Sequence, residues 1–344
     1  MALQYPMADA MRLIREGNLG EATALLRTSL GGGVAPARTP AAGGVIDLAP
    51  MRVTTDAARP GRMEDRRHDG AGGAVDYLLY RPADARPAMP LVVMLHGCTQ
   101  TPDDFARGTG MNRVADEHGF LVAYPRQTAS ANPQKCWNWF RPGDQRRGAG
   151  EPALIAGMAG DILAAERADP ARVYVAGLSA GGAAAAVLAE AYPDVFAAVG
   201  VHSGLACGIA RDVPSALAAM RSGPGPAAAR RGGGGGRFVP LITFHGDRDG
   251  TVAEANARAI VREASAAAGV PVTVSVESGE AGGRRFTRAL SRNAGGDVLI
   301  EQWTVAGAGH AWSGGDPAGS YADAAGPDAS QAMARFFLAN PMRG

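Results

Sequence analysis

Residues 172–188 read RVYVAGLSAGGAAAAVL, and three successive patterns in this stretch decide the fold class. The first five residues form a β-rich run, and the last seven favour a helix. Between them, Gly177 to Gly181 fit GxSxG, in which small residues let the backbone turn sharply and lift a serine oxygen above a sheet. A tight structural turn is the alternative for the motif alone. The strand and helix that flank it favour Ser179 as a nucleophile.

The alternation of strand and helix continues along the chain. We expect strands at 75–81, 91–95, 120–124, 172–176, 197–202, 240–245 and 298–305. We expect helices around 103–118, 153–168, 180–191, 252–267 and 328–339. The run Leu91–Leu95 is apolar at every position, which is typical of a strand covered on both faces. The pattern predicts an α/β fold with a doubly wound, mainly parallel sheet flanked by helices.

The chain divides into three predicted parts. Residues 1–30 carry apolar positions at helical spacing around a Gly-Asn turn and predict a short helical hairpin. Residues 31–69 are rich in Gly, Ala and Pro and are expected to be a linker, and residues 70–340 form the predicted catalytic domain. Within that domain, residues 222–237 contain five successive glycines and predict a mobile surface insertion.

Composition excludes several classes of partner. The 344 residues are 46% hydrophobic and 19% charged, enough to bury a large core. The net charge of +1 at pH 7 leaves no electrostatic footprint for nucleic acid or an anionic membrane. No apolar run is long enough to cross a bilayer. Charged residues interrupt positions 9–16, so we expect no secretory leader and a cytoplasmic protein.

Cysteine usage argues against a metal site. Cys98, Cys136 and Cys207 are too few and too scattered for a zinc site or a disulfide scaffold, and we expect no metal or organic cofactor. In a cytoplasmic protein Cys98 and Cys136 are expected to be free thiols. A single bridge between them is the alternative in an exported protein.

A serine hydroxyl needs a histidine to accept its proton. In a sheet of this kind the order along the chain is serine, acid, histidine. Only His202, His245 and His310 follow Ser179, and only His310 also follows the best acid. It lies in a Gly-rich loop after the expected strand at 298–305, so we predict His310 as the base. His202 and His245 are expected to be packed or hydrogen-bonded at strand ends.

The acid lies in the loop HGDRDGTV at 245–252, which offers Asp247 and Asp249. We favour Asp249 as the residue that orients the histidine and keep Asp247 as the alternative. One of the two is expected to bind backbone N–H groups of the turn or to cap the following helix, since aspartate often does so.

The predicted oxyanion hole uses two backbone N–H groups. One comes from Ala180, the residue after the nucleophile, and the other from Cys98, in the turn LHGCTQ that ends an early buried strand. A Gly-containing turn without this role is the alternative. His96 is expected to be structural, because it precedes Ser179 in the chain.

The loop CWNWF at 136–140 concentrates aromatic rings among polar residues. A loop can rarely bury three large rings, so we expect Trp137 and Trp139 to line a substrate cleft, and we assign Trp312, close to His310, to the same cleft. A local packing cluster is the alternative.

Several motifs together resemble one known family. They are LHGCTQTPDDFARGTGMN, GFLVAYPRQ, NPQKCWNWF, RVYVAGLSAGG, HSGLACG, HGDRDGTV and GAGHAWSGG. The sequence from about 70 to 340 is similar to the polyhydroxybutyrate depolymerase-like esterases, which are related to the feruloyl and acetylxylan esterases of carbohydrate esterase family 1. The resemblance implies an α/β-hydrolase fold and a triad of Ser179, Asp249 and His310. The Gly-rich insertion departs from the family pattern.

The expected activity is carboxylic ester hydrolysis through an acyl-enzyme. The resemblance implies a small or polymeric ester as substrate, either a hydroxyalkanoate oligomer or polyester or a short-chain or aryl ester. A feruloyl or acetylxylan ester is the alternative. Two rivals of another class are acyl transfer to an alcohol and a non-enzymatic binding module on a hydrolase scaffold. The sequence makes no prediction of oligomeric state.

Overall fold

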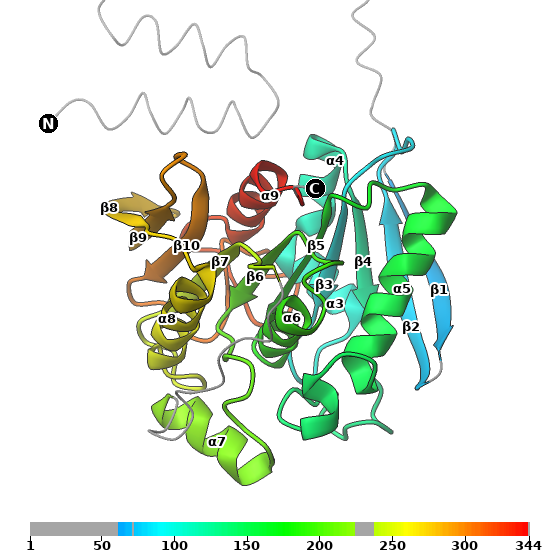
Figure 1. Cartoon of the computed structure of the whole chain (residues 1–344), viewed down its shortest axis with the longest axis horizontal. Helices are drawn as coiled ribbons and strands as arrows, with labels where there is room; N and C mark the ends of the chain where they lie inside the picture. The colour runs from blue at the N-terminus through cyan, green and yellow to red at the C-terminus, as the bar shows by residue number, and fades with distance from the viewer. Residues whose placement is uncertain (1–60, 71, 224–236, 343–344) are drawn as a thin grey trace, which may run out of the picture. The chain divides into compact units, whose positions relative to one another are not determined.

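The computed structural model describes residues 61–70, 72–223 and 237–342, which form the unit drawn in colour in Figure 1. The predicted hairpin at 1–30 and most of the predicted linker lie outside the described residues. So does nearly all of the insertion expected at 222–237. Within the described ranges, no helix combines the length and apolar character needed to span a bilayer.

The described residues form one large sheet. It has ten strands in the order β1-β2-β4-β3-β5-β6-β7-β10-β9-β8 (Figure 1). In that order, the strands are Arg62–Gly70, Gly73–Arg81, Leu121–Pro125, Leu91–Leu95, Val173–Leu178, Ala198–His202, Leu241–Gly246, Val298–Val305, Arg284–Arg292 and Thr273–Ala281. Neighbours from β4 to β10 are parallel, and an antiparallel pair completes each edge. The predicted mainly parallel sheet is confirmed.

Helices cover both faces of the sheet (Figure 1). The helices α5 (Gly150–Glu166), α6 (Ala180–Ala191) and α8 (Ala255–Ala268) pack apolar side chains on one face. The helices on the other face are α3 (Pro102–Thr109), α4 (Met111–His118) and α9 (Ala329–Ala339). The doubly wound arrangement is therefore confirmed. It leaves the carboxyl ends of the parallel strands free to carry a site.

Two helical predictions need correction. A single helix was expected around 103–118, but α3 and α4 are separated by Gly110, whose φ of 61° ends the first helix. The helix α7 (Val213–Ser222) was not expected. It begins with a capping box in which the Asp212 carboxylate accepts a hydrogen bond from the Ser215 backbone N–H at 2.8 Å.

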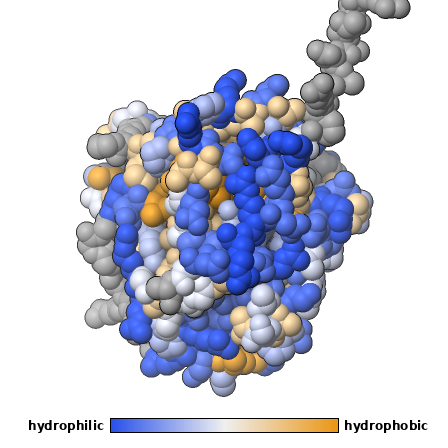
Figure 2. All heavy atoms as spheres, turned by 90° about the vertical axis from the view of Figure 1, so that its right-hand side faces the viewer, coloured by the Kyte–Doolittle hydropathy of each residue, from blue (hydrophilic) through white to orange (hydrophobic). Residues whose placement is uncertain are grey.

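The predicted linker also needs correction, because its last part is the strand β1. Its sequence RMEDRRHDG lacks apolar alternation, since only one flank of this edge strand meets other residues. Polar contacts hold it instead. Arg67 lies opposite Asp76 of β2, with 3.0 Å between guanidinium and carboxylate, and Arg66 reaches Glu166 of α5 at 2.8 Å. The side of the molecule that bears β1 is mostly hydrophilic (Figure 2).

Candidate active site

Ser179 lies in the turn between β5 and α6, where the sequence motif placed it. Its backbone has φ 59° and ψ −119°, a conformation that costs a non-glycine residue about 1 to 3 kcal/mol. The flanking glycines allow the chain to pass closely. A Cβ on Gly181 would stand 2.1 Å from the Leu95 carbonyl oxygen, and one on Gly177 would stand 2.4 Å from the backbone of Gly181. The strained serine is thus held by packing that only glycine permits.

The turn after β3 runs beside this serine. A Cβ on Gly97 would lie 3.7 Å from the Cβ of Ser179, and Gln100 fixes the turn by accepting a hydrogen bond from the Gly97 N–H at 2.8 Å. The backbone of Cys98 is therefore next to the elbow, as an oxyanion hole requires. Donation by the Cys98 and Ala180 N–H groups remains our prediction.

The loops after β7 and β10 bring Asp249 and His310 together. The His310 Nδ1–H donates to the Asp249 carboxylate at 2.7 Å. The other carboxylate oxygen accepts from the backbone N–H groups of Thr251 and Val252 at 2.9 and 2.8 Å. Burial alone would raise the pKa of Asp249, but these hydrogen bonds and the His310 charge lower it to about 2. The ionised carboxylate holds the tautomer in which His310 Nε2 can accept a proton.

Asp247 has a different partner. Its carboxylate accepts a hydrogen bond from the Gly307 N–H at 2.6 Å, at the start of the loop that carries His310. The acid loop is closed from below by His245, whose Nε2–H donates to the Val252 carbonyl at 2.8 Å. The structure therefore pairs Asp249 with His310 as well as with N–H groups of its own turn, and it pairs Asp247 with the Gly307 N–H. It confirms the hydrogen-bonded place expected for His245.

His202, at the end of β6, connects the elbow with the histidine loop. Its carbonyl accepts from the Ser179 N–H at 2.9 Å, and its ring Nε2 accepts from the Ser313 N–H at 3.0 Å. The ring also stacks on Trp312 at 5.0 Å between centroids. Burial, aided by the charges of His245 and His310, lowers the pKa of His202 to about 3, so the ring stays neutral and accepts. This positioning role was not predicted, because no local motif marks it.

Ser179 and the loop of His310 thus lie at the same carboxyl edge of the sheet, where His202 bonds to the Ser179 N–H on one side and to the Ser313 N–H on the other. Among the described residues, no hydrogen bond joins the Ser179 hydroxyl to His310. Nucleophile and base often approach closely only when substrate is bound.

The three tryptophans are core residues. Trp137, Trp139 and Trp312 are only 2%, 5% and 1% exposed. The Trp137 indole N–H donates to the His96 carbonyl at 3.1 Å, and that of Trp312 donates to the Ser330 hydroxyl at 3.0 Å. The expectation that these rings line an open cleft is therefore wrong, and the alternative of local packing holds. The N–H groups of Trp137 and Trp312 are satisfied inside the protein, as buried indoles require.

The aromatic loop can bury its rings because a carboxylate anchors it. Glu151 of α5 accepts from the Asn138 backbone N–H at 2.7 Å, from the Asn138 amide at 2.6 Å and from the Gln127 amide at 2.5 Å. Burial raises the pKa of Glu151 to about 6 despite these donors. Gln127 also donates to the Cys136 carbonyl at 3.1 Å, which ties the loop to the end of β4.

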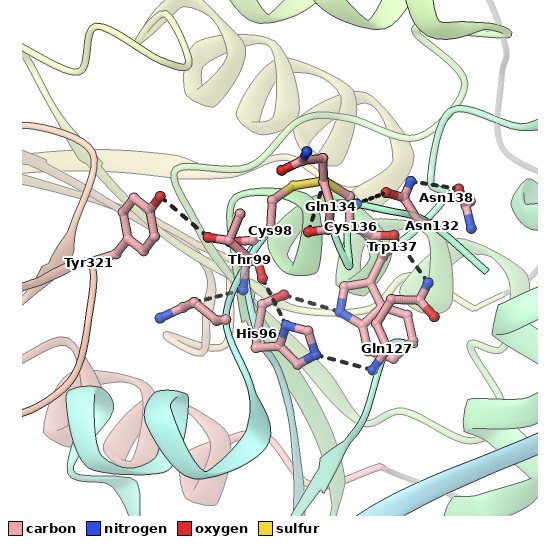
Figure 3. The surroundings of a disulfide bond; sticks show 12 residues. His96, Cys98, Thr99, Gln127, Asn132, Gln134, Cys136, Trp137, Asn138 and Tyr321 are labelled. Carbon is pink, nitrogen blue, oxygen red and sulfur yellow. Dashed lines mark hydrogen bonds between the residues drawn. A yellow bond between two sulfur atoms is a disulfide. The ribbon is translucent and has the colours of Figure 1, made fainter. Parts of the chain in front are cut away.

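A disulfide joins this loop to the oxyanion turn (Figure 3). Cys98 and Cys136 are bonded, with their Cα atoms 4.2 Å apart, so the expectation of free thiols is wrong. That expectation came from the N-terminal sequence alone and could not register that the fold brings the two residues together. The Thr99 N–H donates to the Gln134 carbonyl at 2.6 Å and adds a second tie between the two segments.

A serine at a strand-turn-helix elbow, with an acid and a histidine in later loops of a doubly wound sheet, defines the α/β-hydrolase fold. A solved structure supports this class: the acetyl xylan esterase from Aspergillus awamori has a TM-score of 0.63 and 21% identity, covering 73% of this chain and 94% of that one. The chain belongs to the family described as Esterase PHB depolymerase, whose family model matches residues 75–281. The resemblance seen in the sequence is thereby confirmed.

Curated relatives carry related names. The chain is 37% identical over 267 residues to poly(3-hydroxyalkanoate) depolymerase C from Paucimonas lemoignei, covering 75% of this chain and 61% of that protein. It is 37% identical over 128 residues to feruloyl esterase B from Neurospora crassa, covering 37% of this chain and 43% of that protein. The match to poly(3-hydroxybutyrate) depolymerase from Ralstonia pickettii covers 54% of that protein at 31% identity. The chain therefore spans less than two thirds of these relatives.

Proposed function

We propose that this protein hydrolyses carboxylic esters with Ser179 as nucleophile, His310 as general base and Asp249 as the residue that orients it. The observation that carries the proposal is the 2.7 Å hydrogen bond from His310 to the buried Asp249 carboxylate. It lies at the same sheet edge as a serine held in a strained turn. Backbone strain costs free energy wherever it occurs, and strained residues are found mostly at functional sites, where the surrounding structure holds them.

The proposed reaction has two halves. Ser179 Oγ attacks the ester carbonyl carbon while its proton passes to His310 Nε2, and the N–H groups of Cys98 and Ala180 bind the oxyanion. The bond to the alcohol breaks, and His310 returns the proton to the leaving oxygen. Water then attacks the acyl-enzyme and gives its proton to His310, and the carboxylic acid leaves as Ser179 recovers its hydrogen.

For the substrate we propose a hydroxyalkanoate oligomer or polyester, or a short-chain or aryl ester. The family match and the long alignment to a poly(3-hydroxyalkanoate) depolymerase support this choice. Feruloyl or acetylated polysaccharide esters are the second candidate, supported by the shorter alignments to a feruloyl esterase and an acetylxylan esterase. Rates on hydroxybutyrate oligomers, feruloyl esters and acetylated xylan, measured side by side, decide between them.

Acyl transfer and simple binding are distinguished by product analysis. Ester turnover with added alcohol should give mainly free acid, whereas a transferase would give the new ester. A fluorophosphonate probe should label Ser179, and a binding module would remain unlabelled.

The N-terminal sequence predicted a cytoplasmic protein. The disulfide between Cys98 and Cys136 instead supports a compartment in which disulfides persist.

Ser179→Ala tests the nucleophile. The variant should fold as the wild type does but lose kcat by roughly 10⁴ to 10⁶, since only binding and oxyanion stabilisation would remain. Ser130→Ala, at an exposed loop serine, is the matched control and should keep full activity. Steady-state hydrolysis of p-nitrophenyl butyrate with thermal melts measures both. Activity of the Ser179 variant within tenfold of wild type would end the proposal.

A further inference from the structure

Tyr321 stands exposed beside the proposed catalytic residues, although no sequence motif marks it. Its ring meets the His310 ring edge-on at 6.4 Å between centroids, and its hydroxyl lies 3.5 Å from the Thr99 hydroxyl, next to the oxyanion turn (Figure 3). The residue is 46% exposed, and among the described residues it is the one aromatic member of the exposed large hydrophobic residues. An exposed ring between the base and the oxyanion turn is placed to meet a bound ester.

The backbone of Tyr321 is held on both sides. Its carbonyl accepts from the Trp312 N–H at 2.7 Å, beside the short parallel pair of β11 (Trp312–Ser313) and β12 (Ala322–Asp323). The preceding Ser320 donates its N–H to Asp104 at 2.9 Å. The segment that presents the ring is therefore anchored to α3 and to the loop of His310.

This anchored backbone is also strained. Tyr321 has φ 50°, a left-handed conformation that is unusual for an aromatic residue and costs about 1 kcal/mol or more. Thr99, the residue it faces, has φ 67°. A glycine or asparagine would hold either turn with less strain. The side chain at 321 therefore has a use that its backbone conformation does not supply.

The hydroxyl of Tyr321 is available to a ligand. The Thr99 hydroxyl spends its hydrogen on the Cys98 carbonyl at 2.6 Å, so in the contact with Tyr321 the phenol must be the donor. At 3.5 Å that contact is at the limit of a hydrogen bond. A carbonyl oxygen of a bound substrate could replace it at a shorter distance and gain a better bond.

We propose that Tyr321 positions the alcohol portion of the ester, with its ring bounding the side where His310 protonates the leaving oxygen and its hydroxyl donating to a carbonyl in that portion. This inference rests on the proposed function. It names the substrate class more closely: esters whose alcohol is itself a hydroxy acid derivative, as in successive hydroxyacyl units. An alcohol without a carbonyl would meet the ring but leave the hydroxyl unused.

Two acetyl esters separate the ring from the hydroxyl. Methyl 3-acetoxybutanoate carries a carbonyl in its alcohol portion, and sec-butyl acetate has a branched alcohol without one. Tyr321→Phe should lower kcat/KM for the first by about 5- to 10-fold and for the second less than twofold, as expected for one neutral hydrogen bond. Tyr321→Ala should lower both by a further factor of about ten, because the apolar ring contact is lost as well.

Two further variants separate positioning from stability. Tyr321→Asn suits the left-handed backbone and should keep or raise Tm while losing activity like the alanine variant. Tyr80→Phe is the control. It removes a hydroxyl of β2 that donates to the Asp116 carboxylate at 2.6 Å, and it should leave the ratio of the two kcat/KM values unchanged.

The outcomes are distinct. Equal losses on both esters in Tyr321→Phe, or no loss in any Tyr321 variant, would overturn the inference while the proposed hydrolysis stands. A Tyr321→Asn variant that loses both Tm and activity would mean that the residue is only structural. Wild-type protein that hydrolyses neither ester, with no label from a fluorophosphonate, would overturn the proposed function and this inference with it.

Discussion

At the scale of single residues, unusual backbone conformations gather at the candidate active site. Ser179, Ser203, Thr99 and Tyr321 are non-glycine residues with φ between 49° and 67°. Ser179 lies in the elbow, Ser203 follows the last residue of β6, and Thr99 lies in the oxyanion turn. Strain of about 1 kcal/mol or more at each persists only where surrounding hydrogen bonds fix the chain. The same bonds therefore limit how far these residues can move when substrate binds.

The two aspartates of the acid loop should respond differently to removal of their charge. Asp249→Asn should lower kcat by roughly 10³ to 10⁴, because an amide no longer selects the His310 tautomer whose Nε2 accepts a proton. Asp247→Asn keeps an oxygen for the Gly307 N–H and should cost about 1 kcal/mol or less of stability with little change in kcat. Kinetics and urea unfolding of both variants test this. The reverse pattern would move the acid to Asp247.

The sequence predicted the residues of the site where a local motif carries them. Ser179 lies in the elbow, and Asp249 and His310 lie in loops that follow strands. Order along the chain pointed to His310 and to the acid loop, while the choice of Asp249 over Asp247 needed the resemblance to the family. His202 and Tyr321 were missed as site residues for a different reason. Their roles depend on contacts with residues over a hundred or two hundred positions away, at Ser313 and Thr99, which no spacing reveals.

At the scale of elements, the disulfide loop deserves a test of its own. Replacing both Cys98 and Cys136 by serine opens a cross-link that spans 38 residues and should lower the free energy of unfolding by about 3 to 4 kcal/mol in the chain-entropy account. Urea unfolding with and without reductant measures this. In the double variant, reductant should have no further effect.

Cys207, the third cysteine of the chain, offers the matched control because it lies outside the disulfide. Cys207→Ser should leave stability nearly unchanged and keep its sensitivity to reductant, because the disulfide remains. Mass spectrometry after alkylation should find one blocked cysteine in the native protein. Three alkylated cysteines in protein purified without reductant would show that the bond does not form.

Sequence analysis predicted Leu91–Leu95 with its observed bounds, and every residue of this strand is buried. Val298–Val305 was also predicted with its observed bounds, although it is only partly buried. The outer strands β1, β8 and β9 were missed. β1 and β9 are rich in charged residues, and the alternating valines of β8, Val274 and Val276, are exposed rather than part of the core. The aromatic loop failed for the opposite reason. Its polar composition suggested exposure, while Glu151 and the disulfide allow it to pack inside.

At the scale of the whole molecule, three buried histidines line the carboxyl edge of the sheet. Burial lowers the pKa of His96 to about 4 and of His202 to about 3, and it also lowers the pKa of His245. His96 and His202 are therefore neutral in the folded protein at pH 5, whereas histidines of the unfolded chain bind protons near pH 6.5. Because the unfolded state binds more protons, stability falls as pH falls from about 6.5 towards 4.

One variant isolates this effect. His202→Asn should unfold more easily at pH 7.5, because contacts with Ser313 and Trp312 are lost. Its loss of stability between pH 7.5 and 5 should be smaller than that of wild type by about 2 kcal/mol, since one titrating histidine is gone. Urea unfolding at both pH values measures the difference. His118→Asn, at an exposed histidine, is the control. Equal pH dependence in wild type and His202→Asn would contradict the account.

The glycines around Ser179 have a consequence for how such a protein can change over generations. Every single-base change of a glycine codon that alters the amino acid adds at least a Cβ, and at Gly177 and Gly181 that atom would meet backbone within 2.4 Å. Neither glycine can therefore be substituted without displacing the backbone of the turn. Tyr321, by contrast, has solvent on one side and a backbone that other residues tolerate. Substitutions at Tyr321 can therefore change which esters the proposed site accepts during evolution, while the turn that carries Ser179 keeps its two glycines.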